Sequence, residues 1–412
     1  MAMQRRKIAI VTGAALIFLD EKKRKRIWCK KWYKYRNKYS HINLLNEIEI
    51  EEPADLYNYL RMDIASFEFL LQLIEPKITK QNTRMRQSVT ARERLIATLR
   101  YLATGRTYAD MKFTCAISPQ LLGKIIPETC KELFMALKDD FIKFPSTTED
   151  WLEVARGFAN TWNFEHCLGA MDGKHIAIKQ PPHSGSYYFN YKSYYSIVLF
   201  AVVNANYEYL YIHTGTNGRV SDGGVIQETD FYDKLENGLL NLPPPSILRN
   251  SQIVAPYVFI GDDAFQLSDH VMKPYRKDIN TPRNERIFNY RLCRARRTVE
   301  NAFGITACRF RVLLSTISLE NVNNIDYVVM ACCALHNFLR RNSSNYMTIQ
   351  CMDHENHNHT VTPGEWRQEQ SHQLHGLLNR GRNCEERAKV IRKLFTEYYN
   401  NEGQVAFQSQ FI

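Results

Sequence analysis

The chain has 412 residues, 44% of them hydrophobic and 12% aromatic, which excludes a disordered chain and allows two or more domains with sizeable cores. The formal net charge of +11 favours a polyanionic partner, nucleic acid before membrane, because the cations cluster in Arg-rich stretches beside aromatic residues. The 10 cysteines contain no CxxC pair, which argues for reduced intracellular thiols and against a zinc knuckle.

Residues 1–50 are predicted to form a basic N-terminal arm. The apolar run Ile8 to Leu19 is shorter than the roughly 20 residues of a membrane span, so we expect no membrane partner. The segment Lys22 to Arg36 mixes cations with Trp and Tyr. It predicts nuclear import, with the cytoplasm as a second location, and a phosphate-contacting arm; the alternative is a solvated basic helix. The DNA-contact candidates here are Lys22, Lys23, Arg24, Lys25 and Arg26.

Residues 51–150 have a helical pattern without strand-like alternation. Thr90 and Glu93 have the spacing of a capping box, in which the threonine side chain caps the helix and the glutamate reaches back. An apolar periodic stretch follows and stops at Gly105, the residue type that most often ends a helix.

Two further helices are predicted after this one. Thr107 caps a short helix, and Ser118 caps a longer one after a brief turn. This order is typical of a helix-turn-helix domain, in which Ser118 to Lys131 would read DNA and Lys124 and Lys131 would contact it. A plain helical bundle that serves as a scaffold explains the same residues.

Residues 151–342 change to short β-rich segments. Strands are predicted at Cys167–Ile178, Tyr194–Asn204, Tyr207–Thr214 and Tyr257–Ile260, and a helix at Asp222–Leu235. Three antiparallel strands, a helix and a strand that rejoins the sheet predict an α/β fold, a ribonuclease-H-like mixed sheet with flanking helices.

Three acidic residues of this domain are candidates for one catalytic site. Asp172 lies within the first strand, and Asp262 follows the apolar fourth strand. Glu300 lies at the edge of an apolar stripe on a long, Arg-rich helix, so it can converge with the two aspartates. Asp263, the nearest rival to Asp262, should point to the opposite face and cap the following turn.

Carboxylates gathered in one cleft repel one another unless cations lie among them, and hard oxygen ligands select Mg²⁺ or Mn²⁺. Two such ions clamp the attacking and leaving oxygens of a phosphodiester displacement, which is nuclease chemistry. We therefore predict that Asp172, Asp262 and Glu300 bind the ions. We also expect that neutralising any one carboxylate relieves repulsion in the metal-free protein.

Arginines crowd the helix before Glu300. Arg294, Arg296 and Arg297 are candidates for contacts with DNA phosphates. The alternative is internal pairing, in which Arg296 and Arg297 hold Glu300 in a salt bridge, and we expect mixed use. Residues 343–412 are predicted to form a polar loop, which contains His354, His357 and His359, and a C-terminal helical tail.

Several stretches together resemble one known family. The motifs, in chain order, are MDGKHI, KSYYSIVLFAVVNA, TNGRVSDGG, GDDAF, NYRLCRARRTVENAFG with RFRVL after it, and ACCALHNFL. They look like the PIF/Harbinger transposases and the Harbinger transposase-derived nucleases, over roughly Trp28 to Arg341. By this resemblance Asp172, Asp262 and Glu300 match, in order, the three acids of the DDE triad. The family's usual His-Asp pair after the third strand is Ser221-Asp222 here.

The resemblance implies a ribonuclease-H-like DDE domain that cleaves DNA at the ends of a transposon and joins them to a short A/T-rich target. It also implies a Myb-like partner protein that supplies DNA binding and nuclear import, which weakens the helix-turn-helix prediction, and it leaves room for a homo-oligomer. Two hypotheses follow. The first is an active metal-dependent DNA endonuclease or transposase; the second is a domesticated, non-catalytic DNA- or chromatin-binding protein derived from one.

Overall fold

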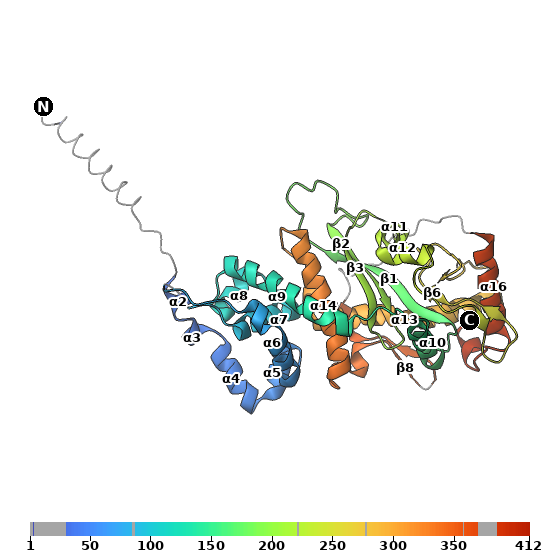
Figure 1. The fold of residues 1–412 in the computed structure, drawn as a ribbon, viewed down its shortest axis with the longest axis horizontal. Coiled ribbons are helices and arrows are strands. Elements are labelled where there is room, and N and C mark those ends of the chain that lie inside the picture. Colours follow the sequence, from blue (N-terminus) through green and yellow to red (C-terminus); the bar gives the residue numbers. More distant parts are fainter. Residues whose placement is uncertain are drawn as a thin grey trace.

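The structure is a computed structural model, which describes Met3 and residues 30–84, 87–220, 222–276, 278–356, 358–369 and 385–412. The apolar run Ile8 to Leu19 and the cations from Lys22 to Arg26 lie outside these ranges. A helical half and an α/β half lie next to each other along the long axis, with helix α14 (Val322–Asn342) between them (Figure 1). Within the described ranges, every helix is too short or too polar to cross a membrane.

The helical half consists of consecutive helices, as the sequence predicts. They are α2 (Lys31–Lys34), α3 (Arg36–Tyr39), α4 (Ile42–Glu51), α5 (Pro53–Leu60), α6 (Ile64–Ile78), α7 (Ala91–Thr104), α8 (Tyr108–Cys115) and α9 (Pro119–Phe141). The capping box of Thr90 and Glu93 is confirmed, and Gly105 ends α7 in the left-handed conformation with φ 64°.

The boundary predicted at residue 50 is wrong, because the chain folds onto the helical half from residue 31. Arg36 is buried, its Nε lies 2.7 Å from Glu93 Oε1, and its guanidinium also donates to the Ser88 carbonyl at 2.9 Å. Residues 31–51 are therefore part of the helical domain, and any free arm ends before them.

Helix α9 has an apolar face that packs in the bundle. Leu122, Ile125 and Ile126 are buried, and α9 contacts α6, α7, α8 and α14. Lys124 is exposed on the outer face, and the exposed Lys131 places its ammonium over the Tyr327 ring at 5.7 Å. The bundle alternative thus accounts for the apolar residues, while DNA reading by the two lysines stays a prediction.

The main sheet has the strand order β3-β2-β1-β6-β7. Its strands are β1 (Cys167–Ala177), β2 (Ser196–Val203), β3 (Tyr209–Asn217), β6 (Val258–Ile260) and β7 (Val271–Met272). The first three pair antiparallel, whereas β6 runs parallel to β1 and β7 to β6. The mixed sheet is confirmed, with strand bounds shifted by a few residues from the predicted ones.

The connection between β3 and β6 contains several short elements where one helix was predicted. The expected helix at Asp222–Leu235 is divided into α11 (Asp222–Val225), the 3-10 turn η1 (Ile226–Glu228) and α12 (Asp230–Glu236). The break occurs because Thr229 leaves the helical conformation and its side chain caps α12 by accepting from Tyr232 N. A small sheet of β4 (Ser246–Ile247) and β5 (Val254–Ala255) follows.

Alternation along β2 divides the core into two layers. Val198, Phe200 and Val202 pack with Trp151 of α10 (Thr148–Trp162) and with Phe231 of α12. The alternate residues Ile197, Leu199, Ala201 and Val203 belong to the layer that includes α13 (Arg283–Arg309). The sheet is thus covered by helices on both faces, as an α/β layer fold requires.

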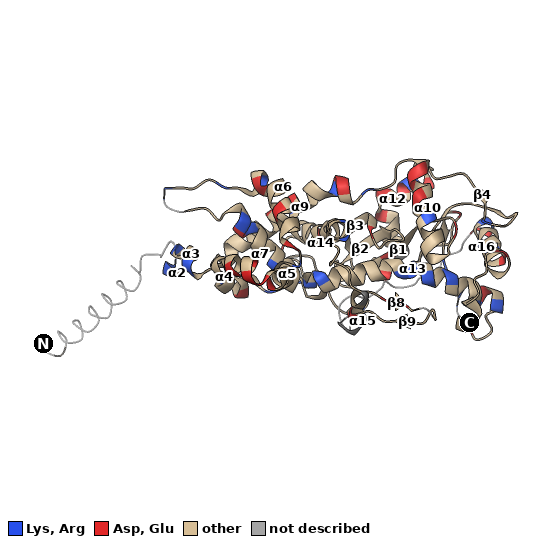
Figure 2. Cartoon of the chain, turned by 90° about the horizontal axis from the view of Figure 1, so that it is seen from below, with Lys and Arg blue, Asp and Glu red and all other residues tan. Residues whose placement is uncertain are grey.

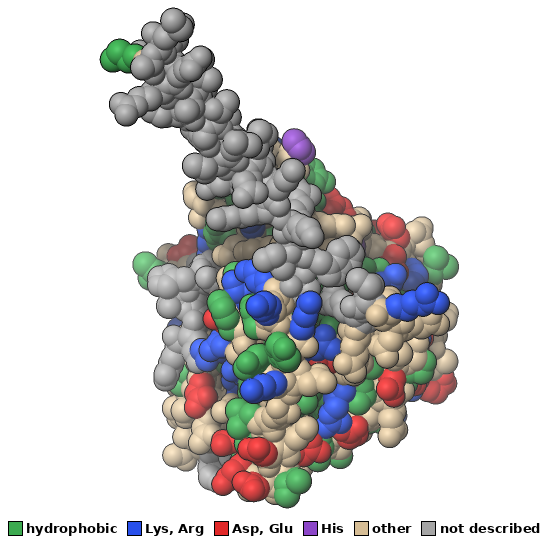
Figure 3. Space-filling view, turned by 90° about the vertical axis from the view of Figure 1, so that its left-hand side faces the viewer, with side chains coloured by type: hydrophobic (Ala, Val, Ile, Leu, Met, Phe, Trp, Pro, Cys, Tyr) green, Lys and Arg blue, Asp and Glu red, His purple; other side chains and the backbone are tan. Residues whose placement is uncertain are grey.

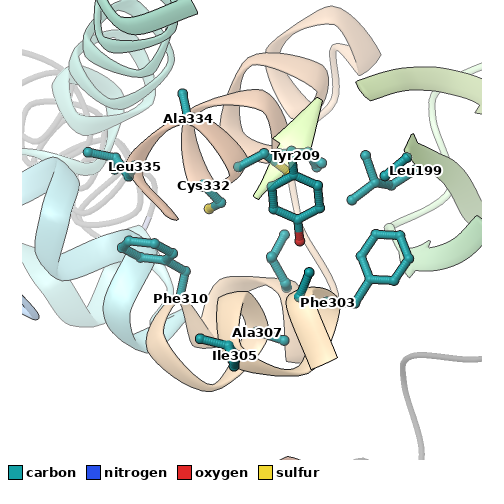
Figure 4. Packing of buried hydrophobic residues seen from close by; sticks show 14 of the residues in the cluster. Leu199, Tyr209, Phe303, Ile305, Ala307, Phe310, Cys332, Ala334 and Leu335 are labelled. Atoms are coloured by element: carbon teal, nitrogen blue, oxygen red, sulfur yellow. The ribbon is translucent and has the colours of Figure 1, made fainter. Parts of the chain in front are cut away.

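Helix α13 carries the predicted apolar stripe into this second layer, since Phe288, Leu292, Ala295, Val299 and Phe303 are all buried. Figure 4 shows how the layer continues into the helical half: the end of α13 and the following Phe310 face residues of α14, and Leu199 and Tyr209 of the sheet lie next to them. One hydrophobic cluster therefore runs through both halves of the molecule.

The C-terminal part is helical near its end, as predicted, but it is docked on the core. The 3-10 turn η2 (Arg311–Leu314) follows α13. The elements after α14 are η3 (Ile349–Cys351), β8 (His354–Glu355), β9 (Val361–Thr362), α15 (Glu365–Glu369), α16 (Glu386–Asn400) and η4 (Gln408–Phe411). Phe395 and Tyr399 of α16 are buried with Phe288 and Leu292 of α13. An aromatic face on α16 thus anchors the end of the chain beside the sheet.

Because the core is continuous, truncating a residue at the junction should destabilise the whole molecule. Leu335→Ala on α14 should lower the free energy of unfolding by about 2–5 kcal/mol, the usual cost of a cavity at a fully buried leucine. Denaturant unfolding, followed by circular dichroism, should remain one transition. The exposed Leu239→Ala is the control and should change little; two separate transitions in Leu335→Ala would contradict the continuous core.

Candidate active site

Asp172 lies in the middle of β1 with its carboxylate on the α13 side of the sheet. Its partner on β2 is Ala201, which belongs to the core layer under α13, and directly paired residues point to the same face. The residue is only 3% exposed, and Lys174, two positions along the strand, places Nζ 2.9 Å from Asp172 Oδ2. A buried carboxylate is thus matched by a cation from its own strand.

Asp262 follows β6 and stands level with Asp172. Ala170 pairs with Ile260 in the parallel ladder, so the positions two residues further along each strand lie beside each other. Asp262 Oδ1 accepts a hydrogen bond from Ala264 N at 3.0 Å, which fixes the turn after the strand. Burial first, and then the charge of Asp172, raise the pKa of Asp262 to about 6.

Glu300 reaches the same face from α13 and is held by two arginines. Its Oε1 forms an ion pair with Arg296, one turn earlier on the helix, and its Oε2 accepts from Arg367 at 2.9 Å. Burial alone would raise the pKa of Glu300, but Arg296, Lys174 and Arg367 outweigh it and lower the pKa to about 2. Glu300 is therefore a fully ionised, fully paired carboxylate.

The three acidic residues converge, as the sequence predicts, around two shared cations. Burial works to lower the pKa of Arg296, but Glu300, Asp172 and Asp262 all act on this arginine and raise it. Burial likewise works to lower the pKa of Lys174, yet Asp172 and Glu300 raise it. The charge of Lys174 also works to lower the pKa of Asp262. The site is a mixed cluster of carboxylates and internal cations, more nearly neutral than a bare acidic triad.

Asp263 is separated from this cluster. Lys273 places Nζ 3.6 Å from Asp263 Oδ1 and donates to the Asp263 backbone carbonyl at 3.0 Å. The turn-fixing hydrogen bond that we expected from Asp263 is made by Asp262. The choice of Asp262 as the residue facing Asp172 is supported, because Asp172 contributes directly to the raised pKa of Asp262.

The arginines of α13 divide between internal roles. Arg294 is 7% exposed and bonds Glu355 Oε2 at 2.8 Å and the Trp162 carbonyl at 2.7 Å, so its guanidinium is enclosed in protein. The DNA-contact prediction for Arg294 is therefore corrected to a structural role. Arg296 holds Glu300, as the pairing alternative proposed, whereas Arg297 lies 3.8 Å from Glu355 and does not join that salt bridge.

The remaining candidates lie outside the cluster. His359 Nδ1 lies 2.6 Å from Glu355 Oε1, and His357 is outside the described residues. Ser221 is also outside them, and Asp222 begins α11.

Sequence reasoning missed Lys174 and Arg367. A signal for Lys174 was present, because a residue two positions from Asp172 on a strand shares its face. Arg367 lies 67 residues after Glu300 and carries no local signal of the pairing.

The comparisons with known proteins agree with this geometry. A family model described as DDE superfamily endonuclease matches residues 171–337, the stretch that holds all three acidic residues. The chain is 22% identical to "Protein ALP1-like" of Arabidopsis thaliana, over 70% of this chain and 71% of that protein. These matches support a place for the chain in the PIF/Harbinger family of DDE transposases and transposase-derived nucleases.

Further relatives support the same membership. The chain is 22% identical to "Putative nuclease HARBI1" of Rattus norvegicus and 20% identical to the protein of that name in Homo sapiens. Each alignment covers 71% of this chain and 78% of the relative. No solved structure matches the chain significantly.

DDE endonucleases generally use divalent metal ions, and the donor set of this site fits such an ion in part. Asp172 and Asp262 offer hard oxygen ligands, and burial, followed by the charge of Asp172, raises the pKa of Asp262. Glu300, in contrast, has an arginine on each oxygen. Accordingly, no group of at least three His, Cys, Asp or Glu residues in the described ranges is arranged to hold a metal ion. Asp262, and Asp172 despite its pairing with Lys174, offer oxygen ligands to an ion, whereas Glu300 can join only after its ion pairs rearrange.

The two kinds of carboxylate should respond oppositely to neutralisation in metal-free protein. Asp262→Asn should raise the melting temperature at pH 7, because ionised Asp262 is destabilised by burial and by Asp172. Its folded pKa of about 6 exceeds its ordinary value of 3.8, so the gain should shrink as the pH falls from 6 to 4.

Glu300→Gln should instead lower the melting temperature at pH 7, since Arg296 and Arg367 would lose their anion. This corrects the expectation that neutralising any triad carboxylate relieves repulsion. The contribution of Glu300 is present above its ordinary pKa of 4.5 and is lost as the pH falls through about 2. Melting curves of both variants in EDTA, from pH 4 to 8, would check the signs; equal shifts would contradict them.

Proposed function

We propose that this protein is a divalent-metal-dependent DNA endonuclease of the PIF/Harbinger type, and that strand transfer to target DNA uses the same site. The observation that carries the proposal is the convergence of Asp172, Asp262 and Glu300 on one face of the sheet, from two parallel strands and a covering helix. The DDE endonuclease family match and the nuclease-named relatives support this reaction class.

The residues act in distinct ways in this proposal. Asp172 and Asp262 would hold an ion, and Glu300 would complete the ligand set. Bound Mg²⁺ or Mn²⁺, two ions in the complete site, would supply Lewis-acid activation of the attacking and leaving oxygens. Lys174 and Arg296 balance the charge of the carboxylates and hold their side chains in place until the ions bind. Burial beneath α13 excludes water, which strengthens every charge interaction in the site.

A DNA-binding surface is proposed at the far end of the helical half. Lys and Arg mark α2 and α3 in Figure 2, and Figure 3 shows cations beside exposed hydrophobic side chains on this end. The rings of Trp32 and Phe113 are stacked, with their centroids 6.0 Å apart. Lys112 Nζ lies 4.4 Å from the Phe113 ring centroid. Phe113 is 65% exposed, so the group offers both charge and stacking to a nucleic acid.

The same proposal covers the substrates, the partner and the location of the protein. The substrates are the transposon ends and a target DNA, and a Myb-like partner protein shares DNA recognition. We propose a nuclear location, with the cytoplasm as a second one, and no membrane partner. A homo-oligomer would allow two sites to act on two DNA ends.

A second candidate function is a non-catalytic DNA- or chromatin-binding protein derived from such a transposase. It is favoured by one observation, that both oxygens of Glu300 are already paired with arginines. The two candidate functions predict opposite outcomes in a DNA cleavage assay, so the same experiment distinguishes them.

The triad should be required for cleavage. Asp172→Asn, Asp262→Asn and Glu300→Gln should each reduce Mg²⁺- or Mn²⁺-dependent nicking of a duplex carrying the element ends by roughly 10²-fold or more, because each removes a ligand charge from a shared site. The Myb-like partner is included in the assay. Asp263→Asn is the matched control and should keep most of the activity, since Lys273 holds Asp263 apart from the cluster.

Two results would contradict this assignment. Loss of activity in Asp263→Asn but not in Asp262→Asn would exchange the roles of the two aspartates. Absence of cleavage by the parent protein with either metal and with the partner present would favour the non-catalytic candidate.

The basic arm should contribute to DNA affinity through counterion release. Deleting residues 1–29 should flatten the slope of log K against log salt by about 0.9 for each phosphate that the arm neutralises in the full chain. Arg36 is retained in this deletion because it is anchored to Glu93 within the helical domain. Fluorescence anisotropy with a labelled duplex over a range of salt concentrations would measure the slope; an unchanged slope would show that the arm neutralises no phosphates.

A further inference from the structure

Residues 352–369, which follow the family-matched stretch, pack on α13 directly beside Glu300. Asp353 N donates to Asn301 Oδ1 at 3.0 Å, and Asn301 Nδ2 donates back to the Asp353 carbonyl at 3.3 Å. A Cβ atom at Gly304 would lie 2.4 Å from the Trp366 ring, so glycine is required there for this contact. The described part of the 352–369 segment therefore packs against α13 at Asn301, the residue after Glu300, and at Gly304, one turn further on.

Arg367 is presented to Glu300 by a partner behind it. Its Nε lies 2.9 Å from both carboxylate oxygens of Asp353, and a terminal nitrogen lies 2.6 Å from Asp353 Oδ2. The same nitrogen donates to Glu300 Oε2 at 2.9 Å, and the guanidinium lies 4.3 Å from the Trp366 ring. The Asp353 side chain is only 1% exposed. A buried anion and an aromatic face thus fix an arginine that reaches into the catalytic cluster from outside the family domain.

The net negative charge of this cluster is too small to balance two divalent metal ions. Asp172, Asp262, Glu300 and Asp353 provide the negative charges, and Lys174, Arg296 and Arg367 provide the positive ones. The excess is about one negative charge, whereas two divalent ions carry four positive charges. For Glu300 to become a metal ligand, one of its arginines has to leave.

Arg367 is the arginine that can leave more easily. Arg296 lies on the same helix as Glu300 and also acts on both aspartates, and its side chain is 17% exposed. The Arg367 side chain is 41% exposed and comes from α15, a helix of five residues. Solvent and phosphate oxygens can therefore take the place of Glu300 around Arg367 at lower cost.

We propose that Arg367 competes with the divalent ion for Glu300, so that release of the Arg367–Glu300 ion pair completes the metal site. The inference rests on the proposed function. Arg367 is then a positioning residue: it keeps Glu300 in place and ionised without metal, and it sets the metal concentration at which the site becomes complete.

Metal binding by DNA-free protein tests this inference without measuring activity. Mg²⁺ and Mn²⁺ are titrated into the full chain, with binding followed by calorimetry and by the rise in melting temperature. Arg367→Gln should lower the half-saturating ion concentration about tenfold, because one competing cation is removed. Arg367→Lys keeps a charge but loses the two-pronged grip on Asp353, and should shift the value by about 2–3-fold in the same direction. It serves as the test if Arg367→Gln does not fold.

Arg341→Gln is the matched control. Arg341 grips Glu208 with two hydrogen bonds of 2.7 and 3.2 Å, so it is a comparable arginine–carboxylate pair at a different site. The half-saturating ion concentration of Arg341→Gln should equal that of the parent protein. An unchanged or higher value in both Arg367 variants would overturn the inference while leaving the nuclease proposal standing. If the parent itself binds neither ion, the nuclease proposal fails, and the competition fails with it.

Discussion

The burial of carboxylates beneath α13 is the constraint on which the rest of the structure depends. An ionised group taken out of water is costly unless it is paired, so the sheet can carry Asp172 and Asp262 under a helix only if cations accompany them. Lys174 comes from the same strand as Asp172, and Arg296 from the covering helix. The protein thus stabilises its acidic site with its own positive charges. In the proposed nuclease, divalent ions would have to replace or tolerate these charges.

Helix α13 connects this site to the remainder of the molecule. Its apolar stripe packs in the layer that continues through α14 into the helical half, and α16 covers its other end. Glu300 stands at the edge of that stripe, so the position of the carboxylate depends on packing over the whole length of the helix. A rigid support is appropriate for a residue that has to meet two aspartates from different strands. The helical half is therefore a structural support for the site as well as the proposed carrier of DNA contacts.

The mixture of paired and unpaired carboxylates distinguishes two tasks within the triad. Asp262 has a raised pKa, because it is buried and lies near the charge of Asp172. Glu300 has a lowered pKa, because arginines surround it. In the proposed nuclease, Glu300 would therefore join the metal site only after its arginine pairs rearrange.

From the sequence alone we could predict the strands, the long helix and the three acidic residues. These features follow from local patterns: apolar runs that end on aspartate, a helical stripe with Glu300 at its edge, and caps such as Thr90. Alternation along a strand and periodicity along a helix fix which side chains share a face, and faces that carry apolar residues have to meet in a core. The family motifs then fixed the order of the triad.

Which charges pair depends on the folded molecule. The partners of the arginines lie far along the chain, as with Arg367 and Glu300 or Arg294 and Glu355, and a long flexible side chain can reach several anions from one backbone position. Local pattern contains no information on that choice, which depends on the distances that folding creates. For the same reason the sequence predicted a loop and a tail where the structure has a docked segment, since the residues that hold residues 352–369 in place belong to α13.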